Sequence, residues 1–141
     1  MYTLSMRYLT IIGTLLLMGC TVHAPGPQTP PLPHADLIHV TSPLPGQTVG
    51  TTFDVTGEAR GMWYFEASFP VSVEDTSGRV ILQTHAQALG EWMTEAFVPF
   101  KATIELPQAT EIDGVLVIKN DNPSGLPENE KEVRIPIHIR N

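Results

Sequence analysis

The sequence Trp63-Tyr64-Phe65-Glu66-Ala67-Ser68-Phe69-Pro70-Val71-Ser72-Val73-Glu74-Asp75 decides the fold class. Apolar side chains occupy every second position of this segment, and mostly polar side chains lie between them. Because successive side chains of a strand point to opposite faces, the alternation predicts one long, half-buried strand over residues 63–75. The pattern places Trp63, Phe65 and Phe69 in the core and turns Tyr64 and Glu66 outward.

Six further segments have strand patterns. Residues 53–59, 98–106 and 133–139 alternate, residues 114–118 are continuously apolar like a central strand, and shorter segments lie at 38–40 and 80–82. Turn sequences rich in glycine, proline and asparagine separate them. About seven strands in one domain predict an all-β fold, an immunoglobulin-like antiparallel β-sandwich. A small closed barrel is the alternative.

The N-terminus has the order of a bacterial lipoprotein export signal. Arg7 precedes the apolar run 8–18, and the only cysteine, Cys20, follows Gly19. The run is too short to span a bilayer and predicts a signal peptide over residues 1–19. We therefore expect lipidation of Cys20, palmitate included, and a membrane anchor that leaves the protein in the cell envelope on the exported side. Met6 is an alternative start to Met1.

A proline-rich linker is predicted to follow. Residues 20–36 contain five prolines and few large apolar residues, so we expect an extended tether before a folded domain at 37–141. The formal net charge is −7 and the eight basic residues are scattered, which disfavours binding to nucleic acid. Cys20 is the only cysteine, so no disulfide is expected within the domain.

Several motifs together resemble a known family. They are Ser42-Pro43-Leu44-Pro45-Gly46, Val55-Thr56-Gly57-Glu58-Ala59-Arg60-Gly61, Phe65-Glu66-Ala67-Ser68-Phe69-Pro70-Val71, Gly90-Glu91-Trp92-Met93-Thr94-Glu95, Pro99-Phe100 and Lys119-Asn120-Asp121-Asn122-Pro123-Ser124-Gly125-Leu126-Pro127-Glu128. The chain is similar over about 37–139 to the immunoglobulin-like domain family of bacterial spore germination. The resemblance implies an immunoglobulin-like sandwich in an envelope protein and a relation to spore germination. It transfers no catalytic residues.

The candidate binding surface contains aromatic and acidic residues from different segments: Tyr64, Glu66, Trp92, Glu95, Asp121, Asn122 and Glu128. Trp92 lies in residues 87–97, where the strand pattern breaks. We favour its role as a plug over the end of the sandwich. The alternative is an exposed platform of Trp92 and Tyr64 for sugar.

The acidic residues suggest two kinds of chemistry, metal binding and glycoside hydrolysis, and each has a simpler explanation. Residues 120–132 concentrate side-chain oxygens, but their spacing is not that of an EF-hand and Pro123 with Gly125 explains a tight turn, so no metal is predicted. Carboxylates such as Glu66, Glu91 and Glu95 could hydrolyse a glycosidic bond only if two faced each other across a cleft. No catalytic residue and no cofactor is predicted.

The sequence therefore favours a non-catalytic module that binds or scaffolds an envelope protein. One alternative is a peptidoglycan- or carbohydrate-binding module that uses Trp92 and Tyr64. The other is an envelope hydrolase that uses Glu66 or Glu95.

Overall fold

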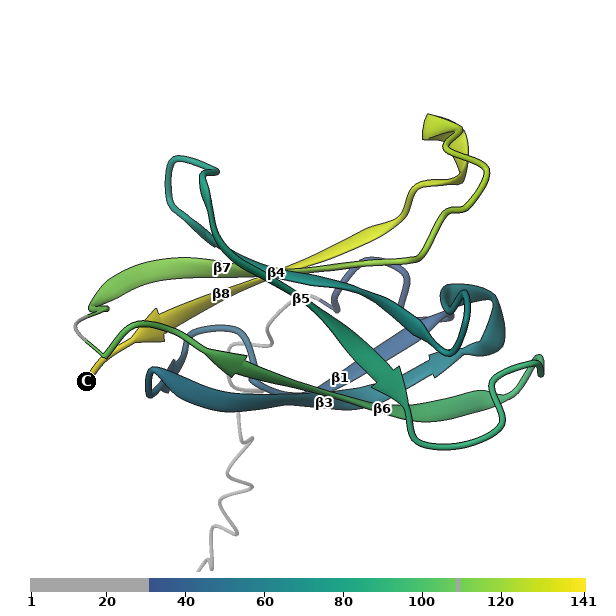
Figure 1. Cartoon of the computed structure of the whole chain (residues 1–141), viewed down its shortest axis with the longest axis horizontal. Coiled ribbons are helices and arrows are strands. Elements are labelled where there is room, and N and C mark those ends of the chain that lie inside the picture. Colours follow the sequence, from purple (N-terminus) through teal and green to yellow (C-terminus); the bar gives the residue numbers. More distant parts are fainter. Residues whose placement is uncertain (1–30, 109) are drawn as a thin grey trace, which may run out of the picture.

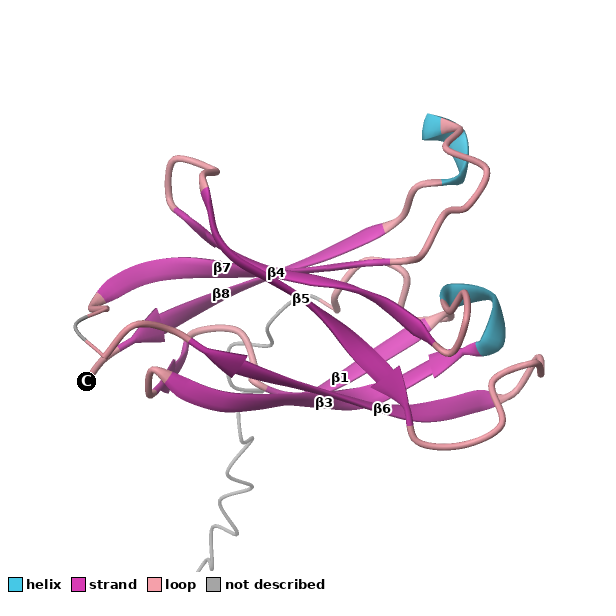
Figure 2. Cartoon of the chain, in the orientation of Figure 1, coloured by secondary structure: helices cyan, strands magenta, loops and turns pink. Residues whose placement is uncertain are grey.

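The computed structural model describes residues 31–108 and 110–141, so the predicted signal peptide, Cys20 and most of the predicted linker lie outside it. The described chain is all-β, and its only helical segments are two short 3-10 turns (Figure 2). Neither is long and apolar enough to cross a membrane. The elements are β1 (Ile38–Ser42), β2 (Gln47–Val49), β3 (Thr52–Arg60), η1 (Gly61–Trp63), β4 (Ser68–Asp75), β5 (Val80–Ala88), β6 (Phe97–Glu105), β7 (Ile112–Lys119), η2 (Pro127–Asn129) and β8 (Glu132–Ile139).

The eight strands form one curled sheet in the order β1-β3-β6-β5-β4-β7-β8-β2. Strands β1, β3 and β6 make one layer, and β4, β7 and β8 lie across the core from it (Figure 1). Strand β5 pairs with β4 along most of its length but with β6 only through Gln87 and Ala88. It therefore carries the sheet from one layer to the other and makes the predicted immunoglobulin-like sandwich.

The two edges of the sheet are β1 and β2. β1 pairs antiparallel with β3, and after the turn at residues 43–46 the chain pairs β2 parallel with β8 in the opposite layer. Over residues 31–108 and 110–141 these edges are not joined to each other, so the sheet is open and the closed-barrel alternative is wrong.

Alternation along the strands fills the core. On β6 the side chains of Val98, Phe100, Ala102 and Ile104 are buried and those between them are exposed. β8 repeats the pattern with four buried β-branched residues, Val133, Ile135, Ile137 and Ile139. Phe69 of β4 meets Phe100 of β6 edge to face, with 4.9 Å between ring centroids, so aromatic packing joins the two layers at the centre.

The predicted strand over residues 63–75 is wrong in its first half. Residues 61–63 form η1, and β4 begins only at Ser68. Glu66 and Ala67 have φ angles of 50° and 63°, in the left-handed region, and residues Phe65 and Ser68 form an isolated bridge. The chain therefore turns sharply before β4, and a strand's alternation cannot continue through the turn.

The strand count also differs slightly from the prediction. β2 is an additional short strand, and β5 extends from Val80 to Ala88 instead of ending at Leu82. The continuously apolar segment does form a central strand, because β7 lies between β4 and β8. Leu116, Val117 and Ile118 are all fully buried there.

A candidate binding surface at the acidic end

One end of the sandwich gathers four segments that we call the acidic end: residues 34–37, 61–67, 89–96 and 120–129. They are the chain leading into β1 and the loops β3–β4, β5–β6 and β7–β8, and they lie together at one end of the molecule (Figure 1). Hydrogen bonds connect them across the chain. The amide of Asp121 donates to the carbonyl of Trp63 at 3.0 Å, and the amide of Arg60 donates to the carbonyl of Leu37 at 2.8 Å.

The β3–β4 loop buries two aromatic side chains and exposes its other large ones. Trp63 is 1% exposed and Tyr64 4% exposed, and both belong to the core. Met62 and Phe65, on either side of them, are 66% and 42% exposed. The prediction that Phe65 is a core residue is therefore wrong, because the turn at Glu66 and Ala67 removes it from the alternation of β4.

The prediction that Tyr64 faces outward is also wrong. Its hydroxyl donates to the carbonyl of Val98 at 2.6 Å, and its ring packs on Phe69 with 5.1 Å between centroids. Burial raises the pKa of Tyr64 well above its ordinary value. Tyr64 is thus a structural residue that closes the end of the core, and it offers no surface to a sugar ring.

The β5–β6 loop carries Trp92, which is half-buried and packs against the core. This placement agrees with the predicted plug and not with an exposed aromatic platform. The neighbouring Met93 is 74% exposed, and its amide donates to the Glu91 carboxylate at 3.3 Å. Glu91 and Glu95 are both exposed.

The two loops touch at Gly61. A Cβ atom at this position would lie 2.0 Å from the carbonyl oxygen of Thr94 and 2.3 Å from that of Trp92. Only glycine allows so close an approach of two backbones. Between the loops opens a pocket of about 330 Å³, lined by Arg60, Met62, Thr94 and Glu95.

Arg60, at the end of β3, ties the segments around this pocket together. Its guanidinium donates to the carbonyl oxygens of Asp36 and Glu95, each at 2.8 Å, and lies 4.4 Å from the centroid of the Phe97 ring. Its hydrogen bonds link the segment before β1 to the β5–β6 loop, and its charge rests on an aromatic face. Arg60 is therefore part of the wall of the pocket, with little freedom to pair with the glutamates around it.

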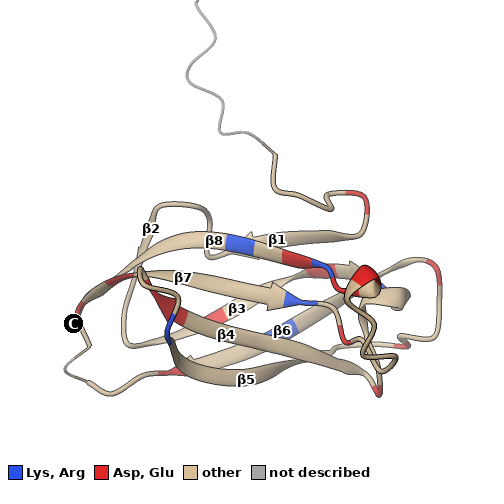
Figure 3. Ribbon diagram, turned by 90° about the horizontal axis from the view of Figure 1, so that it is seen from above, with Lys and Arg blue, Asp and Glu red and all other residues tan. Residues whose placement is uncertain are grey.

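The acidic end holds most of the exposed large apolar side chains in the described chain. Five of the seven are here: Met62, Phe65, Leu89, Met93 and Leu126. Carboxylates accompany them, and Figure 3 shows acidic positions on each of the loops at this end. Sequence reasoning selected Glu66, Trp92 and Glu95 here but missed Met62, Leu89 and Met93, because residues in irregular loops have no periodicity that separates buried from exposed.

The β7–β8 loop contributes the remaining candidates, and its polar side chains hold the loop together. The side-chain amide of Asn122 donates to the carbonyl of Leu126 at 2.8 Å, and Asn120, which is buried, bonds the backbone of Asn129 and Lys131. Asp121 is half-buried and Glu128 exposed. Among the described residues no three His, Cys, Asp or Glu side chains are placed to hold a metal ion together.

The two glutamates of the hydrolase alternative lie on different loops. Glu95 lines the pocket, whereas Glu66 is exposed on the β3–β4 loop and is not one of the four lining residues. An acid–base pair requires two carboxylates to face each other across one cleft. The pocket has one carboxylate, Glu95, in its lining, beside Arg60, and this arrangement does not favour a hydrolase.

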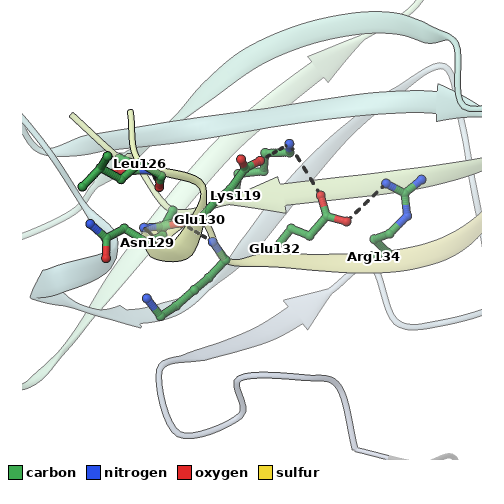
Figure 4. Close-up of polar contacts among 9 residues, drawn as sticks. Lys119, Leu126, Asn129, Glu130, Glu132 and Arg134 are labelled. Carbon is green, nitrogen blue, oxygen red and sulfur yellow. Dashed lines mark hydrogen bonds and ion pairs between the residues drawn. The ribbon is translucent and has the colours of Figure 1, made fainter. Parts of the chain in front are cut away.

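The outer face of β4, β7 and β8 contrasts with this end because its charges form a ladder (Figure 4). Lys119 contacts Glu130 and Glu132, Arg134 contacts Glu132, and Arg134 also bonds Glu74 at 2.6 Å. The hydrogen bond that Lys119 donates to the Glu130 carboxylate raises the pKa of Lys119. Arg134 starts on β8 and reaches Glu74 on β4, so its side chain crosses the outer side of β7, where its register partner Val117 is fully buried.

The fold is that of a single immunoglobulin-like β-sandwich domain, and most of its exposed large apolar side chains lie on the loops at one end. The family model for the immunoglobulin-like domain of bacterial spore germination matches residues 37–126. The chain belongs to this family, as the motifs in its sequence indicated. A search of curated proteins found no match.

Proposed function

We propose that the protein is a membrane-anchored lipoprotein of the cell envelope whose immunoglobulin-like domain binds a partner protein without catalysis. One observation carries the proposal: of the seven exposed large apolar side chains among the residues that the structure describes, five lie at one end of the sandwich. Apolar groups concentrated on one surface of a folded domain are typical of a binding site. Membership of an immunoglobulin-like family of spore germination supports a binding role related to germination.

The position of the predicted anchor fits this proposal. Pro31, where the described chain begins, leads directly into residues 34–37 at the acidic end. His34 packs on Trp63 with 6.1 Å between ring centroids, which fixes this segment to the domain. Eleven residue steps separate Cys20 from Pro31 and span at most about 40 Å. A lipid on Cys20 would therefore keep the acidic end within reach of partners at the membrane.

Two measurements test the anchor. Mass spectrometry of the full-length protein from cells should find the acyl mass on the peptide that begins at Cys20. The Cys20→Ser variant should lack it and leave the membrane fraction. A Cys20→Ser variant that stays in the membrane fraction, or a Cys20 peptide without acyl mass, contradicts the anchor.

Site-specific crosslinking tests the interaction. A photo-crosslinking amino acid at Met93 in the full-length protein should capture the same protein reproducibly in cells. The matched control places the crosslinker at Val80, which is also exposed but lies outside the acidic end. Capture at Met93 should disappear in a Met62→Ser background, whereas equal capture from both positions would show that the acidic end is not the contact surface. Capture of glycan fragments without protein would favour the carbohydrate-binding alternative.

A further inference from the structure

The pocket of the acidic end has one flexible apolar side chain, Met62, in its lining. Met93 and Leu89, on the β5–β6 loop that supplies Thr94 and Glu95 to the lining, are 74% and 63% exposed. Methionine adapts its shape to an incoming group because its side chain is unbranched and polarisable. A pocket of about 330 Å³ is at the lower limit for small-molecule sites and suits a bulky apolar side chain of a partner.

The two loops that meet at this pocket carry negative charge, and one of their carboxylates, Glu95, lines it. Glu66, Glu91 and Glu95 are exposed on the two loops, and neither 61–67 nor 89–96 contains a lysine or arginine. Arg60 is adjacent, but its guanidinium already donates to two backbone carbonyls and rests on Phe97. A partner with lysine or arginine next to its apolar side chain would complement the negative charge of these two loops and be attracted toward them.

This charge argues against three other occupants. A second copy in a symmetric dimer would place the same carboxylates against each other. A bilayer rich in anionic lipid would repel them. The chain's own residues 1–30 contain one basic residue, Arg7, so they supply little complementary charge.

We propose that the acidic end binds a basic segment of its partner, which inserts one bulky apolar side chain beside Met62 while flanking lysines or arginines contact Glu91 and Glu95. This inference rests on the protein-binding role proposed above and specifies the chemistry of the partner.

Short peptides test the chemistry directly. The full-length protein is placed in phosphatidylcholine nanodiscs, and fluorescence anisotropy at low salt follows a labelled Lys-Lys-Leu-Lys-Lys peptide, with empty nanodiscs as the blank. Replacing the central leucine by glycine should weaken binding about tenfold, because burial of one leucine is lost. A Glu-Glu-Leu-Glu-Glu peptide should not bind. Equal binding of the leucine and glycine peptides would overturn the proposal.

Paired variants locate the site. Glu91→Gln with Glu95→Gln should weaken the lysine peptide about fivefold, whereas Glu105→Gln with Glu111→Gln, the same change of net charge away from the acidic end, should leave affinity unchanged. Met62→Ser with Met93→Ser should abolish the preference for leucine over glycine. Leu44→Ser with Val80→Ser, at positions that are also exposed but lie outside the acidic end, should retain it. If a double variant at the acidic end and its control double variant elsewhere had equal effects, in either comparison, the proposal would be overturned.

The crosslink at Met93 in cells separates this inference from the proposed function. A captured segment with lysine or arginine beside a bulky apolar residue supports both. A captured protein segment without basic residues overturns the partner chemistry and leaves the binding role intact. Capture of lipid alone, or of no protein, contradicts both.

Discussion

The acidic end and the outer face of β4, β7 and β8 both carry several carboxylates, but they use them differently. On the outer face, Glu74, Glu130 and Glu132 all contact Lys119 or Arg134. At the acidic end, Glu66, Glu91 and Glu95 lie in loops without a lysine or arginine of their own. Strand register sets this difference, because it places Arg134 beside β7 and within reach of β4, whereas loops impose no such pairing.

Two surfaces with similar acidic residues can therefore differ, one with its charges paired and the other available for binding. Ion pairs on the outer face satisfy the charges of Lys119 and Arg134. The acidic end keeps its charges and its methionines exposed because the backbone contact at Gly61 and the buried Trp63 and Tyr64 already hold the loops in place. Four predictions test this division of roles, in order of decreasing effect.

Gly61→Ala should destabilise the domain most. The added Cβ would lie within 2.3 Å of two backbone oxygens, so the β3–β4 and β5–β6 loops must separate. We expect a loss of about 3 kcal/mol in the free energy of unfolding, measured by urea denaturation. An unchanged unfolding midpoint would show that the loops are not fixed by this contact.

Tyr64→Phe should cost about 1–2 kcal/mol, because the buried carbonyl of Val98 loses its hydrogen-bond donor while the ring remains in the core. Phe65→Ser, one residue along and exposed, should change stability by less than about 0.5 kcal/mol. Urea denaturation of the two variants side by side decides whether Tyr64 faces inward. The opposite order of effects would restore the outward orientation.

Acid should weaken the fold through carboxylates that accept hydrogen bonds on strands and turns. Ser77 and Arg79 lower the pKa of Asp75 strongly, His138 and Arg140 lower that of Asp113, and Lys101 and Thr103 lower that of Asp54. A carboxylate whose pKa is lower in the folded protein than in the unfolded chain, where it is about 3.9, stabilises the fold at pH values above that value. This stabilisation is lost as the pH falls from there toward the folded-state pKa.

Asp75→Asn should therefore lower the free energy of unfolding at pH 7. Below about pH 4, the further decrease of that free energy with falling pH should be smaller than in the wild type. Unfolding midpoints in urea across this range measure both effects. Phe65→Ser, which changes no titratable group, is the control and should keep the wild-type slope. Parallel curves for the wild type and Asp75→Asn would contradict the role of Asp75.

The smallest effects compare the two regions directly. Glu132→Gln removes a contact of both Lys119 and Arg134 and should cost up to about 0.5 kcal/mol at low salt, less in 1 M NaCl. Glu95→Gln should cost nothing measurable, because only its backbone carbonyl accepts from Arg60. Equal losses in thermal unfolding experiments would remove the distinction between the ladder and the acidic end.

The all-β class, most strands and the family follow from the amino-acid sequence alone, because alternation on β6 and β8 indicates which side chains face a core. The candidate surface does not follow from it. The turn at Glu66 and Ala67 has no glycine to mark its left-handed backbone, so the pattern placed Tyr64 outside and Phe65 inside. Only tertiary structure decided that Trp63 and Tyr64 close the core, that Gly61 brings two loops into contact, and that Met62 and Met93 remain exposed. Contacts between loops that are distant in sequence set these positions, so no periodicity in the local sequence predicts them.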